Sequence, residues 1–287
     1  MPETIDTLFV QQYQNTMRLL CQQLDSRLEG TTVPPVKMEG EYLYWERLGA
    51  TEAVELDTRH AATPNLEPDH TRRRSTAMPY VWATMLDRAD ARRMLADPKG
   101  VYQQAARAAM ARRKDRIILA ALGGTAYGGK TGATSIALPS AQKVAHGSAG
   151  MTIAKLLTAK QLLDEAEAPD ERYFVCPSES IIDLLNTTEV SNADYNTVRA
   201  LATGTLDTFL GFKFIRTELI YLENSSSTTT WYCYAYCKGA VGVGNLQDIE
   251  VRVSELPTNN YAWQPWVEMD MGATRIEDEM VVEVASQ

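Results

Sequence analysis

A long stretch of helical periodicity occupies the middle of the chain. Residues 101–122 are mostly Ala, Arg, Leu, Met and Gln, which favour a helix. Asp97 and Pro98 precede it as an N-cap and a first-turn proline, and Gly123 and Gly124 follow as its exit. We expect this helix to lie across a sheet on a narrow buried stripe, with a charged opposite side. The stripe comprises Tyr102, Ala106, Ala109, Met110, Ile117 and Ala120, interrupted by Arg113; the opposite side comprises Arg107, Arg112, Lys114, Asp115 and Arg116.

Shorter amphipathic stretches predict further helices. Residues 5–28 carry apolar residues at helical spacing, and Gly30 ends the pattern before an extended linker at 31–35. The apolar side of this first helix packs either on its own domain or on a neighbouring chain. The other expected helices are 83–96, 153–168 after the cap Thr152, 178–185 after the cap Ser178, and 195–203.

Two stretches predict a long two-stranded arm. Residues 41–48 alternate and are rich in aromatics, and residues 71–84 predict the returning strand, with Pro79 at an edge or a bulge. The connection between them is long and offers no core, which is uncommon in a compact domain unless the loop is functional. An isolated two-stranded arm is also only marginally stable. We therefore expect the arm to lie on another surface.

The remaining strands fall into two groups. Strands at 173–176, 209–216 and 229–237 alternate with helices, which predicts a compact α/β subdomain over 151–245. Residues 248–253, 265–271 and 274–284 alternate apolar and charged positions, as antiparallel strands with one solvated face do. We expect these last strands to form the sheet beneath the long helix. The fold class is α+β, with the α/β subdomain inserted between helix and sheet.

Length and composition are those of a globular protein. The chain has 287 residues, of which 45% are hydrophobic and 23% charged. No apolar run approaches the roughly 18 residues of a membrane span, and the N-terminus lacks the basic start and apolar core of a signal peptide. The cysteine spacing fits neither a disulfide framework nor a zinc site, so we expect Cys233 and Cys237 to be buried thiols and synthesis in a reducing cytoplasm; the other two are Cys21 and Cys176.

The net charge of −9 argues against direct sheathing of nucleic acid. An acidic protein can still enclose DNA as a container, because repulsion keeps the contents from adhering to the wall. Net charge alone does not distinguish a protein that encloses DNA from one that does not contact nucleic acid.

The sharpest chemical motif is Gly124–Thr131, which matches the phosphate-binding pattern G-x-x-x-x-G-K-T. That site needs a strand before the loop and a helix beginning at the lysine, so that backbone amides point at the phosphate. Here a long helix leads in, and the exit contains Gly132 and Pro139. We expect a glycine-rich turn rather than a nucleotide site.

Other candidate chemistry is weak. His60, His70 and His146 lie in expected loops, where solvated histidines are commoner than metal ligands. No serine lies in a nucleophile elbow. The acidic run Glu277–Glu279 is expected to be a solvated strand face. The sequence therefore predicts no enzyme, no cofactor and no metal.

The order of the expected elements resembles the major capsid protein of tailed bacteriophages, with the Hong Kong phage type of capsid fold. The sequence is also similar to one family of these coat proteins over nearly the whole chain. The resembling stretches are ERLGATEAVELDTRHAATP (46–64), HTRRRSTAMPYVWATMLDRADARRMLADP (70–98), NADYNTVRALATGTLDTFLGFKFIRTE (192–218) and GATRIEDEMVVEV (272–284).

The resemblance implies a domain plan and a function. Residues 1–38 would be an N-terminal arm, 39–90 the extended loop with its lead-in helix, 91–146 and 246–287 the peripheral domain, and 147–245 the axial domain. The chain would assemble through hexamers and pentamers into an icosahedral shell that encloses double-stranded DNA. Its partners would be further copies of itself, a portal protein, and scaffolding or decoration proteins, without a membrane. It would be assembled in the host cytoplasm and located in the virion capsid.

The resemblance also points to residues that hold subunits together. Some family members lose an N-terminal segment, which we do not expect here because the chain starts at Met1. Some form covalent Lys–Asn crosslinks, but lysines are scarce near the arm, so we expect non-covalent contacts. The expected inter-subunit ion pairs involve Arg47, Arg59, Arg72, Arg73 and Arg74, with Tyr44, Trp45 and Trp82 as packing anchors. Solvent or phosphate are the other possible partners of Arg72–Arg74.

Two other functions compete with the phage capsid. One is the shell of a bacterial nanocompartment with the same fold, which would package protein instead of DNA. The other, from a different class, is a P-loop nucleotide-binding enzyme.

Overall fold

The computed structural model describes residues 20–55, 58–59, 62–87, 99–186, 208–220, 222–225 and 228–287. The chain divides into two compact units. The first contains Met1–Asp25, Tyr80–Arg112 and Ile249–Met269, and the second contains Ser26–Pro79, Arg113–Asp248 and Asp270–Gln287. The long helix α2 (Lys99–Gly123) and the strands β13 (Val241–Leu256) and β14 (Ala262–Arg275) contribute residues to both units.

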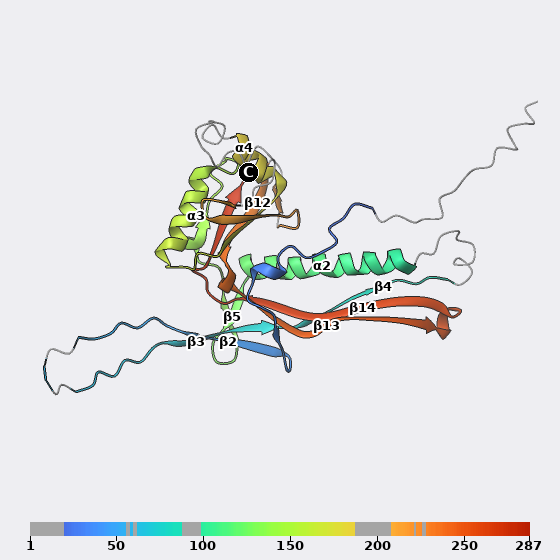
Figure 1. The fold of residues 1–287 in the computed structure, drawn as a ribbon, viewed down its shortest axis with the longest axis horizontal. Coiled ribbons are helices and arrows are strands. Elements are labelled where there is room, and N and C mark those ends of the chain that lie inside the picture. The colour runs from blue at the N-terminus through green and yellow to red at the C-terminus, as the bar shows by residue number, and fades with distance from the viewer. Residues whose placement is uncertain are drawn as a thin grey trace, which may run out of the picture. The chain divides into compact units, whose positions relative to one another are not determined.

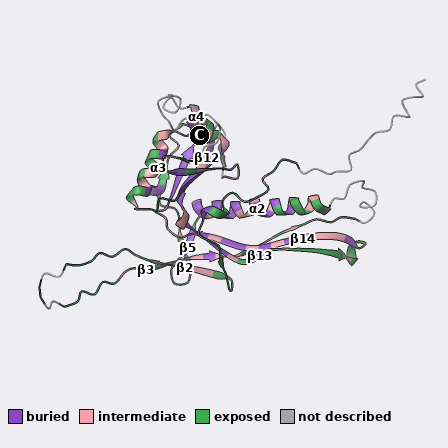
Figure 2. Ribbon diagram, in the orientation of Figure 1, coloured by how far each residue is buried: buried purple, intermediate pink, exposed green. Residues whose placement is uncertain are grey.

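The second unit is built around a seven-stranded mixed sheet. Its strand order is β7-β15-β12-β8-β10-β9, and β11 pairs with β12 beside this path. The strands β12, β8 and β15 lie at its centre and are largely buried (Figure 2). The bounds are β7 (Lys143–Val144), β8 (Arg172–Cys176), β9 (Thr208–Phe209), β10 (Phe212–Arg216), β11 (Leu222–Ser225), β12 (Thr228–Cys237) and β15 (Val281–Ser286).

Helices α3 (Ile153–Glu165) and α4 (Ser178–Asn186) lie beside this sheet (Figure 1). The Thr152 side chain accepts a hydrogen bond of 3.4 Å from the Lys155 amide, which confirms the expected N-cap. The apolar side of α3 and the buried sheet face form one core, whose members include Leu156, Leu163, Leu184, Phe174, Phe212, Cys233 and Val282. The expected strands at 173–176 and 229–237 and the helices beginning at 153 and 178 are therefore confirmed, whereas residues 209–216 form a hairpin with a turn at Leu210 and Gly211 rather than one strand.

A second sheet, of order β2-β3-β5-β6, forms the base of the expected arm. β2 and β3 pair antiparallel over their full length, from Tyr42 opposite Thr76 to Leu48 opposite His70. The bounds are β2 (Tyr42–Leu48), β3 (His70–Thr76), β5 (Ala126–Gly128) and β6 (Thr134–Ile136). The expected returning strand over 71–84 is two strands, because the chain leaves β3 and continues as β4 (Met78–Ala83) in another sheet.

The third sheet has the order β1-β13-β14-β4. β1 (Val36–Lys37) pairs parallel to β13, and β4 is an edge strand, which agrees with the expected position of Pro79. Along β14 the apolar residues Val267, Met269 and Met271 are buried, while Glu268 and Asp270 are partly exposed. This alternation confirms a one-sided strand. Short 3₁₀ turns lie at Glu29–Thr31, Ser140–Gln142, Lys238–Ala240 and Pro257–Asn259.

Helix α2 lies on strands of this third sheet, as its stripe predicted. In the first unit Tyr102 and Ala106 line a small apolar cavity together with Val267. In the second unit Ile118 lines a cavity with Val243 and Met271. Two positions of the expected pattern are wrong: Ala120 is exposed, and Asp115, expected on the charged outer side, is fully buried.

The expected first helix is wrong where the structure describes it. Residues 20–28 are irregular, and the remainder of the 5–28 stretch lies outside the described residues. Residues 83–87 end a strand and form an isolated bridge from Leu86 to Trp263, so the expected helix over 83–96 does not begin there. The rest of that helix, the Asp97 cap and the helix over 195–203 also lie outside the described residues. No described helix has both the length and the apolarity needed to cross a membrane.

The last expected strand lies in a different sheet from the one predicted. β15 pairs with β12 and β7 in the seven-stranded sheet, whereas residues 248–253 and 265–271 lie in the sheet of β13 and β14. The alternation of residues 274–284 suggested one solvated face, but every residue of β15 is buried. The expected acidic strand face over Glu277–Glu279 is also wrong, because these residues form a bend and a turn between β14 and β15.

Candidate functional site: the arm

The arm consists of β2, β3 and the connection over residues 49–69. The described part of this connection has no helix or strand, and nearly all of its residues are exposed. Several exposed side chains are apolar, with Leu48 64%, Val54 54% and Leu66 46% exposed. Only at the base does the pairing continue, where the Gly49 amide donates to the Asp69 carbonyl at 2.8 Å. The arm therefore presents apolar surface without a core of its own. Figure 1 shows the extended path of its described backbone.

One face of the arm base carries tyrosines and arginines in alternation. Arg74 lies over the rings of Tyr42 and Tyr127, at 4.6 and 5.4 Å from the centroids. Arg72 lies 5.5 Å from the Tyr44 ring centroid. Each contact joins neighbouring strands on the same face, where cation–π attraction adds to the stability of the pairing.

Arg72 and Tyr44 also bind polar partners within the chain. Arg72 pairs with Glu46 directly across the ladder at 3.1 Å, and the Tyr44 hydroxyl donates to the Thr131 carbonyl at 3.3 Å. Both side chains of the Arg72–Glu46 pair remain well exposed. An exposed pair of this kind is easily exchanged for another partner.

The opposite face of the arm base is closed by a buried ionic network. Arg73 donates to Asp278 at 2.6 Å, and the second oxygen of Asp278 accepts from Arg275 at 2.6 Å. Arg275 is fully buried and also donates to the carbonyls of Leu122, Gly124 and Ile136. Burial lowers the pKa of the Arg73 guanidinium from its ordinary value, and the charges of Arg47 and Arg275 act in the same direction. Arg73 is thus held inside its own chain.

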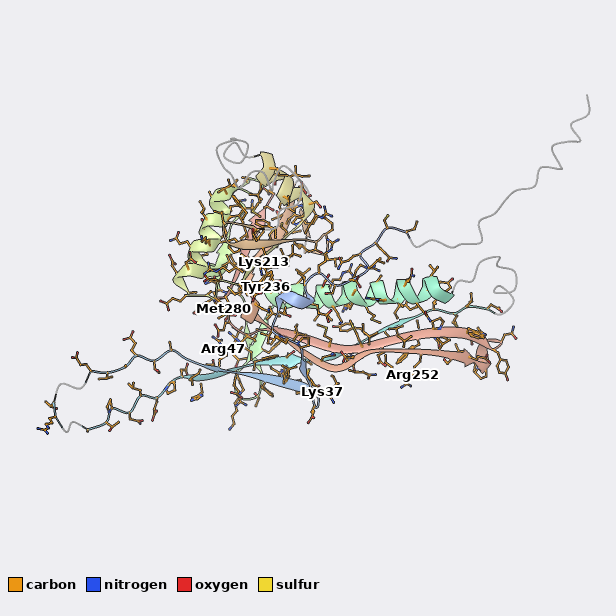
Figure 3. All side chains as sticks on the ribbon, in the orientation of Figure 1. Lys37, Arg47, Lys213, Tyr236, Arg252 and Met280 are labelled. Atoms are coloured by element: carbon orange, nitrogen blue, oxygen red, sulfur yellow. The ribbon has the colours of Figure 1, made fainter. Side chains whose placement is uncertain are left out.

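The other expected contact residues lie in different parts of the fold. Trp45 packs within the chain, since a Cβ on Gly242 would lie 2.5 Å from its ring. Arg47 projects from β2 and is partly exposed (Figure 3), and Arg59 is exposed in the arm connection. Trp82 lies on β4, outside the arm, and is partly buried. The arm base therefore brings together Tyr44, Trp45, Arg47 and Arg72–Arg74, but not Arg59 or Trp82.

The glycine-rich motif forms the turn of a hairpin. Gly124 follows the last residue of α2, residues 126–128 are β5, and Gly129, Lys130 and Thr131 lie in the turn to β6. Gly129 has a φ of 84°, which favours glycine. Because no helix begins at Lys130, the amide array of a P-loop is missing from these described residues, and the turn expected from the sequence is confirmed.

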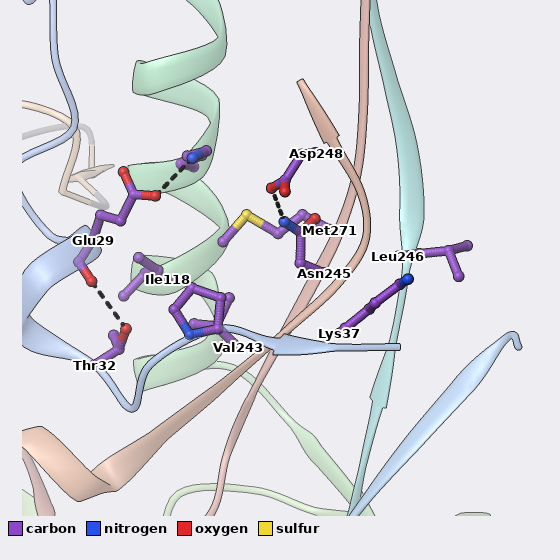
Figure 4. Close-up of a pocket in the computed structure, with 11 residues that line it drawn as sticks. Glu29, Thr32, Lys37, Ile118, Val243, Asn245, Leu246, Asp248 and Met271 are labelled. Atoms are coloured by element: carbon purple, nitrogen blue, oxygen red, sulfur yellow. Dashed lines mark hydrogen bonds and ion pairs between the residues drawn. The ribbon is translucent and has the colours of Figure 1, made fainter. Parts of the chain in front are cut away.

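A cavity of about 290 Å³ is lined by residues between 29 and 37, by helix α2 and by strand β13 (Figure 4). Glu29 and Lys114 pair across it at 2.8 Å, and both line the cavity with Thr32 and Lys37. Nearby, Asp115 accepts hydrogen bonds from the Ser26 hydroxyl and from the amides of Arg27 and Leu28. These contacts hold residues 26–32 against α2 in an irregular conformation.

The cysteines and histidines form no reactive site among the described residues. Cys176, Cys233 and Cys237 are buried, as expected for the last two, and Cys21 is exposed. Burial raises the pKa of Cys233 to about 12 and that of Cys237 to about 11, which makes both thiols inert at neutral pH. His70 is exposed, His146 is partly exposed, and His60 lies outside the described residues. No group of metal-ligating side chains occurs in the described part of the chain.

Comparison with known proteins identifies this architecture. A model of the family described as "Phage capsid protein" matches residues 5–287. This chain belongs to the phage capsid protein family. No curated protein matches the sequence significantly. Phage capsid proteins are structural, so the P-loop enzyme is not favoured.

Solved capsid structures share the fold of this phage capsid protein. The capsid of cyanophage P-SCSP1u matches with a TM-score of 0.79 and 15% identity, covering 100% of this chain and 95% of that one. The capsid of Ralstonia phage GP4 matches at 0.74 with 10% identity, covering 96% and 94%. The capsid of a native GTA particle matches at 0.71 with 12% identity, covering 99% and 97%. The expected Hong Kong phage type of fold is confirmed.

Sequence reasoning missed the residues that hold the arm base together. Asp278 was grouped with a solvated acidic run, and Arg275 was not singled out. Arg275 is the last residue of β14 and Asp278 lies in the bend after it, and Asp278 joins Arg275 to Arg73 of β3, which is distant in the sequence. A long-range ion pair has no local sequence signal.

Proposed function

We propose that this phage capsid protein is the major shell subunit of a tailed phage, assembling through hexamers and pentamers into an icosahedral container for double-stranded DNA. The observation that carries the proposal is the arm. The arm exposes Leu48 at the end of β2 and Val54 and Leu66 in its connection, and the connection has almost no partner within the described chain. Exposed apolar surface of this kind is typical of an interaction site, and a neighbouring subunit supplies the missing core.

The proposed domain roles follow the order of the chain. Residues 1–38 form the N-terminal arm and 39–90 the extended loop. The peripheral domain takes 91–146 and 246–287, and the axial domain, 147–245, meets its copies around hexamer and pentamer centres. Strand β15 belongs to the peripheral segment by sequence but pairs with β12, so the sheet of the axial domain extends into it.

Two residues of the expected contact set also have partners within the chain. Arg73 is buried and bound to Asp278, and Trp45 packs on Gly242, so both support the arm from within. The partly exposed or exposed members of the set, which we propose to contact a neighbouring copy, are Tyr44, Arg47, Arg59, Arg72, Arg74 and Trp82.

The other proposed partners are a portal protein, scaffolding or decoration proteins and the enclosed DNA, with assembly in the host cytoplasm. The net charge of −9 supports a container that does not bind DNA by sequence, because a mostly acidic wall repels the phosphate backbone.

Particle size tests the function directly. We would purify the protein and measure sedimentation, with negative-stain imaging and the nucleic-acid content of any particle. Rings of five or six, or uniform closed shells, are the expected result, and enclosed DNA separates the phage capsid from a nanocompartment. A monomer or dimer at every salt and protein concentration would overturn the proposal.

A variant that lacks the arm connection tests whether the arm is needed for shell assembly. Gly49 and Asp69 are already hydrogen-bonded, so residues 50–68 can be replaced by Asn-Gly, a two-residue hairpin turn. The variant should keep the unfolding midpoint of the subunit and lose the ability to form shells. Normal shells from this variant would show that the arm is dispensable.

A further inference from the structure

The arm base borders a cavity lined mainly by positive charge. Its volume is about 330 Å³, and it lies between β2, β3 and the β5–β6 turn. The cationic lining residues are Arg47, Arg72, Arg73 and Lys130, together with His70. No aspartate or glutamate is among the residues that line it. We call this cavity the cationic pocket.

Arg73, which is among the residues that line the cationic pocket, has an unpaired donor. Its side chain is 5% exposed, with Nη2 on Asp278 at 2.6 Å and Nε on the Ile276 carbonyl at 3.4 Å. Nη1 is buried and has no acceptor among the described residues. Buried donors are almost always paired in folded proteins, so an unpaired one indicates a missing acceptor.

The positive charge at the cationic pocket is also incompletely balanced. Asp278 is the one carboxylate that binds both Arg73 and Arg275, so two guanidinium groups share a single negative charge. Arg72 has an exposed partner in Glu46, whereas Arg47 and Lys130 make no ion pair within the described residues. The pocket is therefore prepared for an oxyanion.

The geometry points to a carboxylate from another copy of this chain: we propose that the cationic pocket receives an aspartate or glutamate side chain of a neighbouring subunit. Each copy carries 37 acidic and 28 basic residues, so a neighbour offers more carboxylates than cations. The turn at Lys130 presents one lysine and no helix N-terminus, which suits a carboxylate better than a polyphosphate. The inference rests on the proposed shell assembly and adds the chemistry of one contact.

Zero-length crosslinking tests this contact. A carbodiimide activates a carboxylate, and an amine in contact with it then forms an amide while the carbodiimide leaves as a urea. Shells assembled from equal amounts of ¹⁴N- and ¹⁵N-labelled protein are treated and analysed by mass spectrometry. We expect Lys130 joined to an acidic peptide in mixed-isotope as well as same-isotope pairs, and no such product from unassembled subunits.

Charge variants supply a second measurement. Lys130→Glu should raise the protein concentration needed for assembly, by about tenfold or more, because a like charge would face the incoming carboxylate. Lys130→Arg should assemble normally while losing the crosslink. Lys160→Glu on α3, outside the pocket, is the matched charge reversal and should assemble like the wild type.

Several results would overturn the inference while leaving the shell intact. Wild-type shells without a Lys130 crosslink, or with same-isotope pairs alone, would show that no neighbour occupies the pocket. Binding of inorganic phosphate to unassembled subunits, lost in Lys130→Glu, together with no crosslink in shells would assign the pocket to a free anion. Failure of the wild type to form any shell would instead overturn the proposed function.

Discussion

The Ser26 hydroxyl donates a 2.5 Å hydrogen bond to the carboxylate of Asp115 in the middle of the long helix. The amides of Arg27 and Leu28 bind the same carboxylate at 3.2 Å. Asp115 is fully buried, and its Oδ1 accepts from all three of these donors.

Replacing Asp115 with alanine should lower the unfolding free energy of the unassembled subunit by about 2–4 kcal/mol. The loss arises because buried amide and hydroxyl donors are left without an acceptor. Asp115→Asn keeps one acceptor oxygen and should cost less. Urea unfolding is the measurement, with Glu165→Ala on an exposed position of α3 as control. Equal stability of Asp115→Ala and the control would contradict this role.

Removing Asp278 should destabilise the subunit more than removing Glu46. Asp278→Ala leaves the buried Arg73 and Arg275 without a counterion, at a cost of about 3–5 kcal/mol. Glu46→Ala breaks the exposed pair with Arg72 and should cost less than about 1 kcal/mol. Urea midpoints of the two variants give the comparison, and similar values would mean that the buried network contributes little.

Gly272 should not tolerate a side chain. A Cβ there would lie 2.1 Å from the Thr76 carbonyl oxygen and 2.6 Å from its carbon, which are backbone atoms that cannot rotate away. We expect Gly272→Ala to lower the melting temperature and to cost at least the 1–3 kcal/mol typical of overpacking. Gly30→Ala is the control, because nothing lies within 4 Å of its Cβ position. A melting temperature unchanged in both variants would refute the close approach.

The buried thiol of Cys233 should make stability depend on alkaline pH. Its pKa is raised to about 12, from an ordinary value of 9.0, because burial disfavours the thiolate. Its contribution is fully present below about pH 9 and is lost as the pH rises toward 12, since the unfolded chain releases the proton first. The stability of the wild type relative to Cys233→Ala should therefore fall over this range.

The matched control for that experiment is Cys21→Ala, because Cys21 is exposed. Its stability relative to the wild type should stay constant over the same pH range. A constant difference for Cys233→Ala as well would contradict the assignment of the buried, protonated thiol.

Elements with strong local signals could be predicted from the sequence. The composition of residues 101–122 gave the long helix, and Thr152 marked the start of α3. The alternation of β14 gave the buried side of that strand. In each case the residues that determine the element lie within it.

Elements determined by distant contacts could not be predicted. The apolar spacing near Leu20, Leu24 and Leu28 favoured a helix, but residues 20–28 are irregular, and their last residues bind Asp115 instead. The alternating stretch at 274–284 could not reveal its sheet, because that depends on pairing with β12. At the arm base the clustering of arginines was evident, while their separation into buried Arg73 and exposed Arg72 depends on Asp278.

The position of β15 between β7 and β12 has a consequence for synthesis on the ribosome. Residues 281–286 fill the gap between strands made much earlier, so the seven-stranded sheet cannot close until these late residues have left the exit tunnel. Until then the edges of β7 and β12 are open and prone to pair with other chains. A nascent chain stalled before β15 should therefore be the form that depends most on chaperones.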